Sequence, residues 1–555
     1  MKKFLITLVL TSILVLPYPP LQAQRKGDKP KRAVASSVAA QRGADVIAAA
    51  QLKDYLYFIA SDEMEGRDTP SRGLDMTARF LAMNLSRWGF KPAGDDGTFF
   101  QKMTLRRETI NKEQTQVQLN GQTLTLGEDY IPLPRSGDAA GQLVFAGSGW
   151  FIKSRDLDPY KGIDAKGKIA VIFAPLNGLP RGIRSSDLSG KRGEDVMDPG
   201  EYALKQGAIA TVTVPDFQFI SNWERNRQRL IERGPTVVEK FQPPGAPHIP
   251  GIVASPRLAN LLFQGEKQSA KSIFEAAFGG EMPASFELNA EKKMNISIAG
   301  QGDTVSTQNV VAVFEGSDPN LKNEYVALGA HYDHLGIGAP VKGDAIYNGA
   351  DDDGSGTTAL LSIAEALAKA TIRPKRSVLF VWHAGEEKGL WGSRYFTNYP
   401  TIPLGKVVAQ LNIDMIGRSK KAGDTNPKNR ELTGPNEVYV IGSRMMSTEL
   451  GELSETVNKS YLNLTFNYLY DDPKDPNRFF FRSDHYNYAV KGIPIIFYFD
   501  GVHEDYHQPG DSADKIDYQK MERIARTVYM TLWEIADRPM RLKVDKKLPG
   551  ELGGN

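Results

Sequence analysis

The sequence predicts an α/β protein: a three-layer sandwich with a mixed, mostly parallel sheet, plus an inserted β-rich domain. After Ser306, strand-like runs such as YVALGAH and SVLFVWHA alternate with helical stretches such as TTALLSIAEALAKA. This alternation is typical of a largely parallel sheet covered by helices. Between residues 136 and 295, short runs such as KIAVIFAP and AIATVTVP are separated by Gly and Pro, which indicates a separate β-rich module. A chain of 555 residues has room for both units.

The first 23 residues have the pattern of a secretory signal peptide. Two lysines precede the apolar run FLITLVLTSILVL, and the small-residue sequence LQA follows it. The run is too short to span a bilayer, and prolines at 17, 19 and 20 end it early. A retained membrane anchor is the alternative. We expect an exported protein, periplasmic or extracellular, without a stable membrane anchor.

The rest of the chain divides by composition. The segment QRKGDKPKRAVASSVAAQRGA is polar, basic and without periodicity, which is typical of disorder. The helical pattern LDMTARFLAMNLSRWGF ends at Gly89 with Pro92 close behind, and a long amphipathic pattern, DYQKMERIARTVYMTLWEIAD, closes the α/β part. The expected order is a signal peptide (1–23), a disordered lead-in (24–44), the first part of the main domain (45–135), the insert (136–295), the second part of the main domain (296–538) and a charged tail (539–555).

Composition narrows the possible partners and chemistry. Lys and Arg number 68 and Asp and Glu 66, so the formal net charge of +2 provides no overall basic field. This balance argues against a nucleic-acid partner. The sequence has no cysteine, which excludes disulfides, thiolate metal ligands and a thiol nucleophile. A metal site in this chain would therefore use histidine and carboxylate side chains.

Candidate ligands follow the strand-like runs of the α/β segment. Six of the seven histidines lie there, and open α/β sheets bind ligands outside the carboxyl ends of their strands. The run YVALGAH ends in His331, and Asp333, two residues further in an extended chain, could accept a hydrogen bond from that imidazole and fix its tautomer. The other strand ends carry Glu386 and Glu387, Asp414, and His507 beside Tyr506.

The acidic loop NGADDDGSG precedes a helical stretch and has three interpretations. It could be a solvated loop that caps the helix. An EF-hand calcium loop is excluded, because the twelfth position counted from Asp351 is Ser362 instead of the bidentate Glu. It could also be a metal site, which the residues alone leave open. Two histidines and three carboxylates at successive strand ends could hold two zinc ions that share one carboxylate.

The stretch HEDYH at residues 503–507 matches the zinc-protease pattern H-E-x-x-H. That pattern requires a helix, since i and i+4 must share a face for both imidazoles to reach one ion. The strand pattern IPIIFYF precedes HEDYH, and Pro509 and Gly510 follow it, so both flanks oppose a helix. We expect a loop in which His507 binds metal, whereas His503 and Glu504 do not.

Six segments spread over residues 331–511 resemble the co-catalytic di-zinc aminopeptidases, relatives of glutamate carboxypeptidase and transferrin receptor: HYDHLG, NGADDDGSG, HAGEEKGLWGSRYF, LNIDMIGR, RSDHYNYAVKGIPIIFY and YHQPGD. The resemblance implies that His331 and Asp414 hold one zinc ion, that Glu387 and His507 hold the other, and that Asp351 bridges them. It also implies that Glu386 is the general base, that Asp333 orients His331, that Tyr506 donates to the developing oxyanion, and that the peptide bond between Asp351 and Asp352 is cis.

The same resemblance implies a secreted aminopeptidase that removes N-terminal residues from peptide substrates with two zinc ions. The insert is similar to the protease-associated domain through YKGIDAKGKIAVIF and KQGAIATVTVPD. The alternatives are a carboxypeptidase acting on acidic peptides, for which Arg418, Arg478 and Arg482 are available, a glutaminyl cyclase, and a non-enzymatic receptor-like homologue. The oligomeric state and the side chain preferred at the cleavage site stay open.

Three histidines and one motif lie outside this set of expected ligands. His334 and His383 flank the expected ligands, and we expect supporting or structural roles for both. Asp484-His485 is similar to an Asp-His pair that family members often carry close to the substrate cleft, and this resemblance implies a contact to substrate as one role for His485. The EMEGR stretch near residue 64 resembles the bacterial members of the family, but its residues suggest no chemical role.

Overall fold

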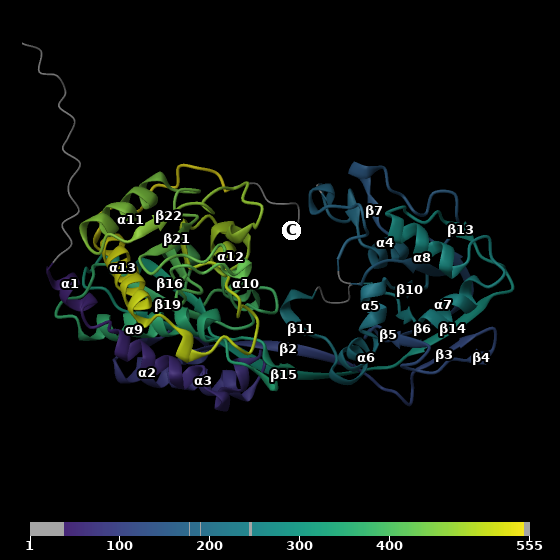
Figure 1. The fold of residues 1–555 in the computed structure, drawn as a ribbon, viewed down its shortest axis with the longest axis horizontal. Coiled ribbons are helices and arrows are strands. Elements are labelled where there is room, and N and C mark those ends of the chain that lie inside the picture. Colours follow the sequence, from purple (N-terminus) through teal and green to yellow (C-terminus); the bar gives the residue numbers. More distant parts are fainter. Residues whose placement is uncertain (1–37, 177, 189, 243–246, 549–555) are drawn as a thin grey trace, which may run out of the picture.

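The chain forms two lobes joined by a pair of long strands (Figure 1). This computed structural model describes residues 38–548 apart from 177, 189 and 243–246. The expected signal peptide and most of the expected lead-in lie outside the described residues. Among the residues described, no helix is long and apolar enough to cross a membrane.

The end of the expected lead-in is helical. α1 (Val38–Ala44) is followed by α2 (Ala49–Ile59), and Ala40 and Ala44 are fully buried in the main hydrophobic core. Gly43 lies so close to the side chain of Tyr529, in α13 (Tyr518–Asp537), that a Cβ atom would clash with it. The expectation of disorder is therefore wrong for residues 38–44, because small side chains let this helix pack closely against the lobe.

The larger lobe is built on one mixed sheet. Its strands follow the spatial order β11-β2-β15-β19-β16-β20-β23-β21-β22, with β1 paired to β15. The central strands β19, β16, β20 and β23 run parallel, and antiparallel pairs adjoin them on both sides. In chain order the strands are β1 (Lys91–Pro92), β2 (Phe100–Ile110), β11 (Thr236–Val238), β15 (Gly300–Phe314), β16 (Tyr325–His331), β19 (Ser377–His383), β20 (Val407–Ile413), β21 (Glu437–Ile441), β22 (Thr465–Asn467) and β23 (Ile495–Phe499).

Helices cover both faces of this sheet, which confirms the predicted three-layer sandwich. In β16, Val326 and Leu328 face one hydrophobic cluster and Ala327 faces another. Because both faces are buried, the strands read as continuous apolar runs in the sequence. The first face is covered by α1, α2, α3 (Arg72–Arg87), α9 (Gly356–Lys369), α11 (Thr448–Ser460) and α13, and the second by α10 (Trp391–Asn398) and α12 (His485–Val490).

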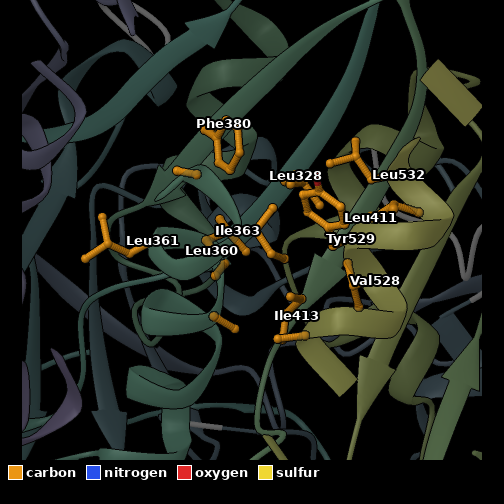
Figure 2. Close-up of a cluster of buried hydrophobic side chains, with 14 of the residues drawn as sticks. Leu328, Leu360, Leu361, Ile363, Phe380, Leu411, Ile413, Val528, Tyr529 and Leu532 are labelled. Atoms are coloured by element: carbon orange, nitrogen blue, oxygen red, sulfur yellow. The ribbon is translucent and has the colours of Figure 1, made fainter. Parts of the chain in front are cut away.

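The centre of the first helical layer fixes α9 against the sheet (Figure 2). Leu328, Leu411 and Ile413 of the sheet share one buried cluster with side chains of both helices that cover them. Those helix residues are Leu360, Leu361 and Ile363 of α9 and Val528, Tyr529 and Leu532 of α13. Burying one such side chain stabilises the fold by roughly 1.5–3 kcal/mol. The acidic loop predicted to lie near the site leads directly into α9, so this packing also positions that loop.

The smaller lobe contains a second sheet and, in addition, several helices. Its strands follow the order β4-β3-β14-β6-β8-β10-β12-β5, with β13 paired to β6, and β6, β8, β10 and β12 run parallel. Their bounds are β3 (Gln116–Leu119), β4 (Gln122–Thr123), β5 (Tyr130–Pro132), β6 (Gly137–Phe145), β8 (Ile169–Phe173), β10 (Ala210–Val214), β12 (Gly251–Ala254), β13 (Phe286–Glu287) and β14 (Lys293–Ile298). The helices are α4 (Pro199–Lys205), α5 (Phe217–Ser221), α6 (Trp223–Arg227), α7 (Pro256–Phe263) and α8 (Ala270–Gly279).

The insert begins earlier than the sequence suggested. β3, β4 and β5 precede residue 136, yet they belong to the second sheet. β2 and β15 pair antiparallel from Phe100 with Val310 to Ile110 with Gly300. Residues 111–299 therefore leave and re-enter the main sheet at adjacent strand ends, in place of the expected 136–295. β3 and β4 were missed because QVQL and QT are short and partly polar, and β5 was missed because YIP is only three residues long.

One segment of the insert packs on the main lobe. β11 pairs with the edge strand β2, and Val238 is buried in the main core. The hydroxyl of Tyr399 donates to the carbonyl oxygen of Lys240 at 3.0 Å, and the Arg394 guanidinium lies 4.2 Å from the centre of the Phe241 ring. The two lobes thus share contacts besides the β2–β15 connection.

The remaining short strands pair as β7 (Phe151–Ile152) with β9 (Val196–Met197), and β17 (Gly336–Val341) with β18 (Asp344–Tyr347).

Candidate functional site

The expected site residues meet at one edge of the main sheet. His331 is the last residue of β16, Asp414 directly follows β20, and Glu386 and Glu387 come shortly after β19. His507 lies in the loop after β23. These are the carboxyl ends of neighbouring parallel strands, where such sheets place their ligands.

Two groups of side chains form there around one shared carboxylate, and all these side chains are buried except that of His507, which is partly exposed. In the first, His331 Nε2 lies 3.2 Å from Asp352 Oδ1 and 3.6 Å from Asp414 Oδ1. In the second, His507 Nε2 lies 3.2 Å from Asp352 Oδ2 and 3.2 Å from Glu387 Oε2. The two oxygens of Asp352 therefore face different histidines.

Asp352, and not Asp351, holds the position between the groups. The carboxylate of Asp351 is turned away: Oδ1 accepts a hydrogen bond from the Gly417 N–H at 2.6 Å, and Oδ2 lies 3.2 Å from His503 Nε2. The expectation that Asp351 is the shared carboxylate is therefore wrong. The cis peptide bond is likewise shifted by one residue, because it joins Asp352 to Asp353 and not Asp351 to Asp352.

The neighbours of these side chains fix their orientation. His331 Nδ1 lies 3.1 Å from the carbonyl oxygen of Asp333, a spacing at which the ring N–H donates and Nε2 is left free to face the group. The Asp333 carboxylate lies 3.6 Å from the same ring nitrogen and accepts the Glu386 N–H at 3.1 Å. Asp333 thus contacts both His331 and Glu386. On the other side, the Ser483 hydroxyl donates to Asp414 Oδ2 at 2.6 Å.

His334 lies within the second group, although only a supporting or structural role was expected for it. Its Nδ1 lies 2.8 Å from Glu387 Oε1 and 3.8 Å from Asp352 Oδ2, and its side chain is fully buried. The spacing in the sequence could have indicated that His334 lies in the site, because it follows His331 by three residues in the turn after β16. Only the conformation of that turn decides that both histidines point into the same site.

Charge and burial shift the proton affinity of the site. Burial raises the pKa of Glu386 well above its usual value, and the carboxylates of Asp414 and Glu387 add to this. For Glu387, burial and Asp352 act upward, but His334 and His507 outweigh them and bring the pKa down to about 2. For His507, burial alone would lower the pKa, but Asp352 and Glu387 raise it to about 10. Of the two adjacent glutamates, Glu386 has the raised pKa and Glu387 the lowered one, so Glu386 is the one that more readily takes up a proton.

A cavity opens directly onto these carboxylates. Asp352, Glu386 and Asp414 line it on one side, and its apolar wall consists of Met415, Phe479, Phe497, Phe499 and Val502. Tyr506 also lines the cavity; its ring stacks on that of His507 with centroids 3.9 Å apart. The Tyr506 hydroxyl lies 3.5 Å from Arg482 Nη2 at the exposed mouth. An apolar side chain can therefore lie beside the reactive carboxylates.

The remaining histidines lie outside the two groups. His383 is buried between Asp484 Oδ2 at 3.3 Å and the Tyr488 hydroxyl at 3.0 Å. His485 donates to the carbonyl oxygen of Phe480 at 2.8 Å and stacks on Phe497, so it faces the core and not the cavity. His503 faces Asp351, as described above. HEDYH forms turns and no helix, as its flanks predicted.

The three arginines considered for binding a carboxylate differ in their surroundings. Arg418 is committed to the protein, because Nη2 lies 2.8 Å from Asp505 and Nη1 lies 3.6 Å from Asp511. The Arg478 guanidinium lies over the Phe481 ring. Arg482 lines the cavity, and within the described part of the chain it makes no ion pair with an acidic side chain.

The EMEGR stretch supplies a residue whose role the sequence did not suggest. It forms η1 (Asp62–Arg67), and the Arg67 guanidinium is fully buried. Its N–H groups donate to the carbonyl oxygens of Ile59, Tyr332, Asn348 and Gly349 at 2.7–3.0 Å. One side chain therefore joins the end of α2 to the two segments that carry His331 and the acidic loop. A local pattern cannot reveal such a role, because all four partners are backbone atoms.

The donor set fits zinc. Zinc binds histidine nitrogen and carboxylate oxygen at about 2.0–2.2 Å in tetrahedral geometry, which places neighbouring ligand atoms about 3.3 Å apart. The separations of 3.2 and 3.6 Å around His331 and of 3.2 Å around His507 agree with this spacing. His334 Nδ1 and Glu387 Oε1 lie closer together, at 2.8 Å, and neither atom makes a hydrogen bond within the described residues. The groups His331, Asp352, Asp414 and His334, Asp352, Glu387 each keep their ligand atoms within 4.8 Å of one another.

Part of this chain is similar in sequence to two known proteins. A probable leucine aminopeptidase 2 from Aspergillus fumigatus is 31% identical over 214 residues, which cover 38% of this chain and 36% of that protein. Leupeptin-inactivating enzyme 1 from Streptomyces exfoliatus is 29% identical over 208 residues, or 37% of this chain and 38% of that protein. The chain thus spans little more than a third of the length of these two relatives.

The fold resembles that of a solved enzyme over most of its length. The aminopeptidase from Aneurinibacillus sp. strain AM-1 superposes with a TM-score of 0.51 at 16% identity, covering 91% of this chain and 98% of that structure. At this identity the likeness concerns the fold alone. The segment that carries all the candidate ligands, residues 309–532, matches the model of Peptidase family M28.

Proposed function

We propose that this protein is an exported zinc-dependent aminopeptidase that hydrolyses N-terminal residues from peptides. The observation that carries the proposal is the pair of histidine–carboxylate groups that share Asp352 and stand beside the proton-accepting Glu386. The names of the relatives, leucine aminopeptidase and leupeptin-inactivating enzyme, support hydrolysis of peptides.

Two zinc ions would be held by the two groups. His331, Asp352 and Asp414 would hold one, and Asp352, Glu387 and His507 the other. His334 would be a further candidate ligand of the second ion, because its Nδ1 lies 2.8 Å from the other oxygen of Glu387 and makes no hydrogen bond within the described residues. Zinc bound there would polarise a carbonyl group and lower the pKa of a water molecule.

The side chains of the site divide the remaining work. Glu386 lines the cavity next to Asp352 and Asp414, and its raised pKa suits a group that takes a proton from the attacking water and returns it to the departing amine nitrogen. Asp333 holds the main chain of Glu386 in place. Tyr506, at the cavity wall, would donate to the oxygen on which negative charge develops.

Replacing Glu386 by Gln tests this assignment. The variant should retain its zinc, because the ligands are intact, and should lose turnover of a leucine arylamide by ~10²–10⁴-fold, the usual contribution of a general base. Glu387→Gln is the matched comparison, because it changes the neighbouring carboxylate by the same single atom and should release zinc. If Glu386→Gln released zinc and Glu387→Gln kept it, the two roles would be exchanged.

A carboxypeptidase is the second candidate, favoured by Arg482 at the cavity mouth. A pair of blocked peptides separates the two activities. An aminopeptidase should cleave the C-terminally amidated peptide and leave the N-acetylated one intact, whereas a carboxypeptidase should do the reverse. Cyclisation of an N-terminal glutamine, read by the loss of ammonia in a mass spectrum, would identify a glutaminyl cyclase, and no change in any peptide would favour a receptor-like protein.

Export and the role of the insert complete the proposal. The basic and apolar pattern of residues 1–23 supports cleavage of a signal peptide, so the mature N-terminus should be at Gln24. Mass spectrometry of protein secreted from cells would detect the uncleaved chain if that is wrong.

Residues 111–299 would serve as a protease-associated domain that restricts which peptides reach the site.

A further inference from the structure

One buried carboxylate, that of Asp511, accepts hydrogen bonds from the main chain of the loop that carries Asp352. Its Oδ1 and Oδ2 accept the Asp351 N–H at 3.1 and 3.0 Å, and its Oδ2 also accepts the Asp352 N–H at 3.0 Å. The Ala350 N–H donates to the main-chain oxygen of Asp511 at 3.0 Å. Asp511 is fully buried, so it receives the N–H groups of three consecutive loop residues out of contact with water.

The carboxylate of Asp351 ties the same loop to a second ligand-bearing segment. Through Oδ1 it accepts the Gly417 N–H, three residues after Asp414. Its Oδ2 lies 3.2 Å from His503 Nε2, a close contact between two buried polar atoms, neither of which makes a hydrogen bond in the described structure. On the other side of the ring, His503 Nδ1 accepts the Asp505 N–H at 3.3 Å. Because Nδ1 accepts, the ring carries a proton on Nε2, the atom that lies 3.2 Å from the Asp351 carboxylate.

We propose that Asp511 and the Asp351–His503 pair are positioning residues that set zinc affinity by holding Asp352 with one oxygen toward each group. The inference rests on the proposed zinc site and assigns a role to the half of HEDYH that does not face the site. The physical reason is reach: Asp352 must direct its two oxygens at His331 and His507 at the same time. A rotation of its main chain would take one oxygen out of range, and fixing that main chain is what the contacts of Asp511 and Asp351 achieve.

The test measures binding of Zn²⁺ alone to metal-free protein, by competition with a colorimetric chelator. His503→Leu removes the imidazole that contacts the Asp351 carboxylate, and we expect zinc affinity to fall by ~10–100-fold, as for other groups that orient metal ligands. His503→Gln places an amide N–H near the position of Nε2 and should recover most of that affinity. Glu504→Gln is the matched control, because Glu504 is an exposed neighbour of His503 whose carboxylate accepts a hydrogen bond from Asn426. The zinc affinity of this variant should equal that of the wild type.

A second variant keeps the test decisive if His503→Leu fails to fold. Asp511→Asn replaces one acceptor oxygen by an N–H₂ group in the same volume, so a donor then lies against the loop N–H groups that both oxygens receive, and we again expect weaker zinc binding. Thermal melting of the metal-free variants separates a general loss of stability from a loss of zinc affinity. Folded His503→Leu or Asp511→Asn protein with wild-type zinc affinity would overturn this inference alone. Wild-type protein that binds no zinc would overturn the proposed function and this inference with it.

Discussion

Three adjacent aspartates in the acidic loop have three different environments. Asp351 faces His503 and Gly417, Asp352 faces His331 and His507, and Asp353 Oδ1 accepts the N–H groups of Gly356 and Met415 at 2.9 and 3.0 Å. Asp353 thus joins the start of α9 to the segment after β20. Only the middle residue of the three presents its carboxylate to both histidine groups.

The shared position of Asp352 leads to a prediction about zinc stoichiometry. Asp352→Asn should weaken both sites, because an amide oxygen is a poorer zinc ligand and the amide nitrogen is not a ligand. Glu387→Gln and Asp414→Asn, which each lie in one group, should weaken only one. Zinc equivalents per chain, measured after dialysis against dilute chelator, provide the comparison. An Asp352→Asn protein that kept one site at wild-type affinity would show that the carboxylate is not shared.

His485 leads to a prediction about acid stability. Burial lowers its pKa from the ordinary 6.5 to about 4, so the folded state holds it neutral while the unfolded chain protonates it more readily. Its contribution is present above pH 6.5 and is lost as the pH falls toward 4, by roughly 3 kcal/mol in all. In urea unfolding of zinc-free protein, His485→Gln should therefore lose less stability between pH 7 and 4.5 than the wild type. Equal losses in both proteins would contradict this assignment.

At the scale of elements, η1 and the hairpin of β17 and β18 form the support for the ligand-bearing turn after β16. Arg67 reaches from η1 to the main chain at Tyr332 and Gly349, and the His334 N–H donates back to the Arg67 carbonyl at 3.1 Å. Gly66 makes this close approach possible. It has φ +66°, and a Cβ atom there would lie 2.4 Å from the Tyr347 oxygen and 2.7 Å from the Gly336 oxygen.

Gly66→Ala should therefore cost more than an ordinary glycine substitution. A positive φ alone costs an alanine ~1–2 kcal/mol, and forcing a methyl group into backbone contact adds ~1–3 kcal/mol. Gly97→Ala is the matched control, because Gly97 has φ +73° with no atom within 4 Å of an added Cβ. The difference between the two unfolding free energies measures the packing cost. Equal destabilisation would show that η1 can move away from the hairpin.

At the scale of the whole molecule, the insert is attached where it can be removed with least damage. Ile110 and Gly300 are paired residues at the end of the β2–β15 ladder, so an Asn-Gly turn can join them as a hairpin in place of residues 111–299. The excision also removes β11, which covers the edge of β2, and Val238 from the main core. We expect a folded but less stable main lobe.

The excised protein tests what the insert does. If residues 111–299 restrict access to the site, hydrolysis of a single-residue arylamide should stay close to that of the full chain. The ratio of rates on long and short peptides should rise, because the long ones gain access. Loss of arylamide hydrolysis in a protein with native zinc content would instead show that the insert completes the site. An unchanged ratio would favour a docking role.

The sequence by itself determined the three-layer fold and the strand ends that carry His331, Glu386, Glu387, Asp414 and His507. Apolar runs and helical spacing are local properties, and the carboxyl ends of parallel strands meet at one edge whatever their connections. It also excluded a helix for HEDYH, because proline and glycine act on the chain next to them.

Only the tertiary structure decided which aspartate is shared, which partner His503 has, what Arg67 does and where the insert begins. Each of these depends on contacts between residues far apart in the sequence. The acidic loop takes its conformation from Asp511, 160 positions away from Asp351, and Arg67 donates to residues more than 260 positions further along the chain. Asp351 and Asp352 are adjacent and chemically identical, and either could take the shared position without any change in the local sequence. No local pattern therefore distinguishes Asp351 from Asp352. The long-range hydrogen bonds that fix the loop dihedrals make that choice.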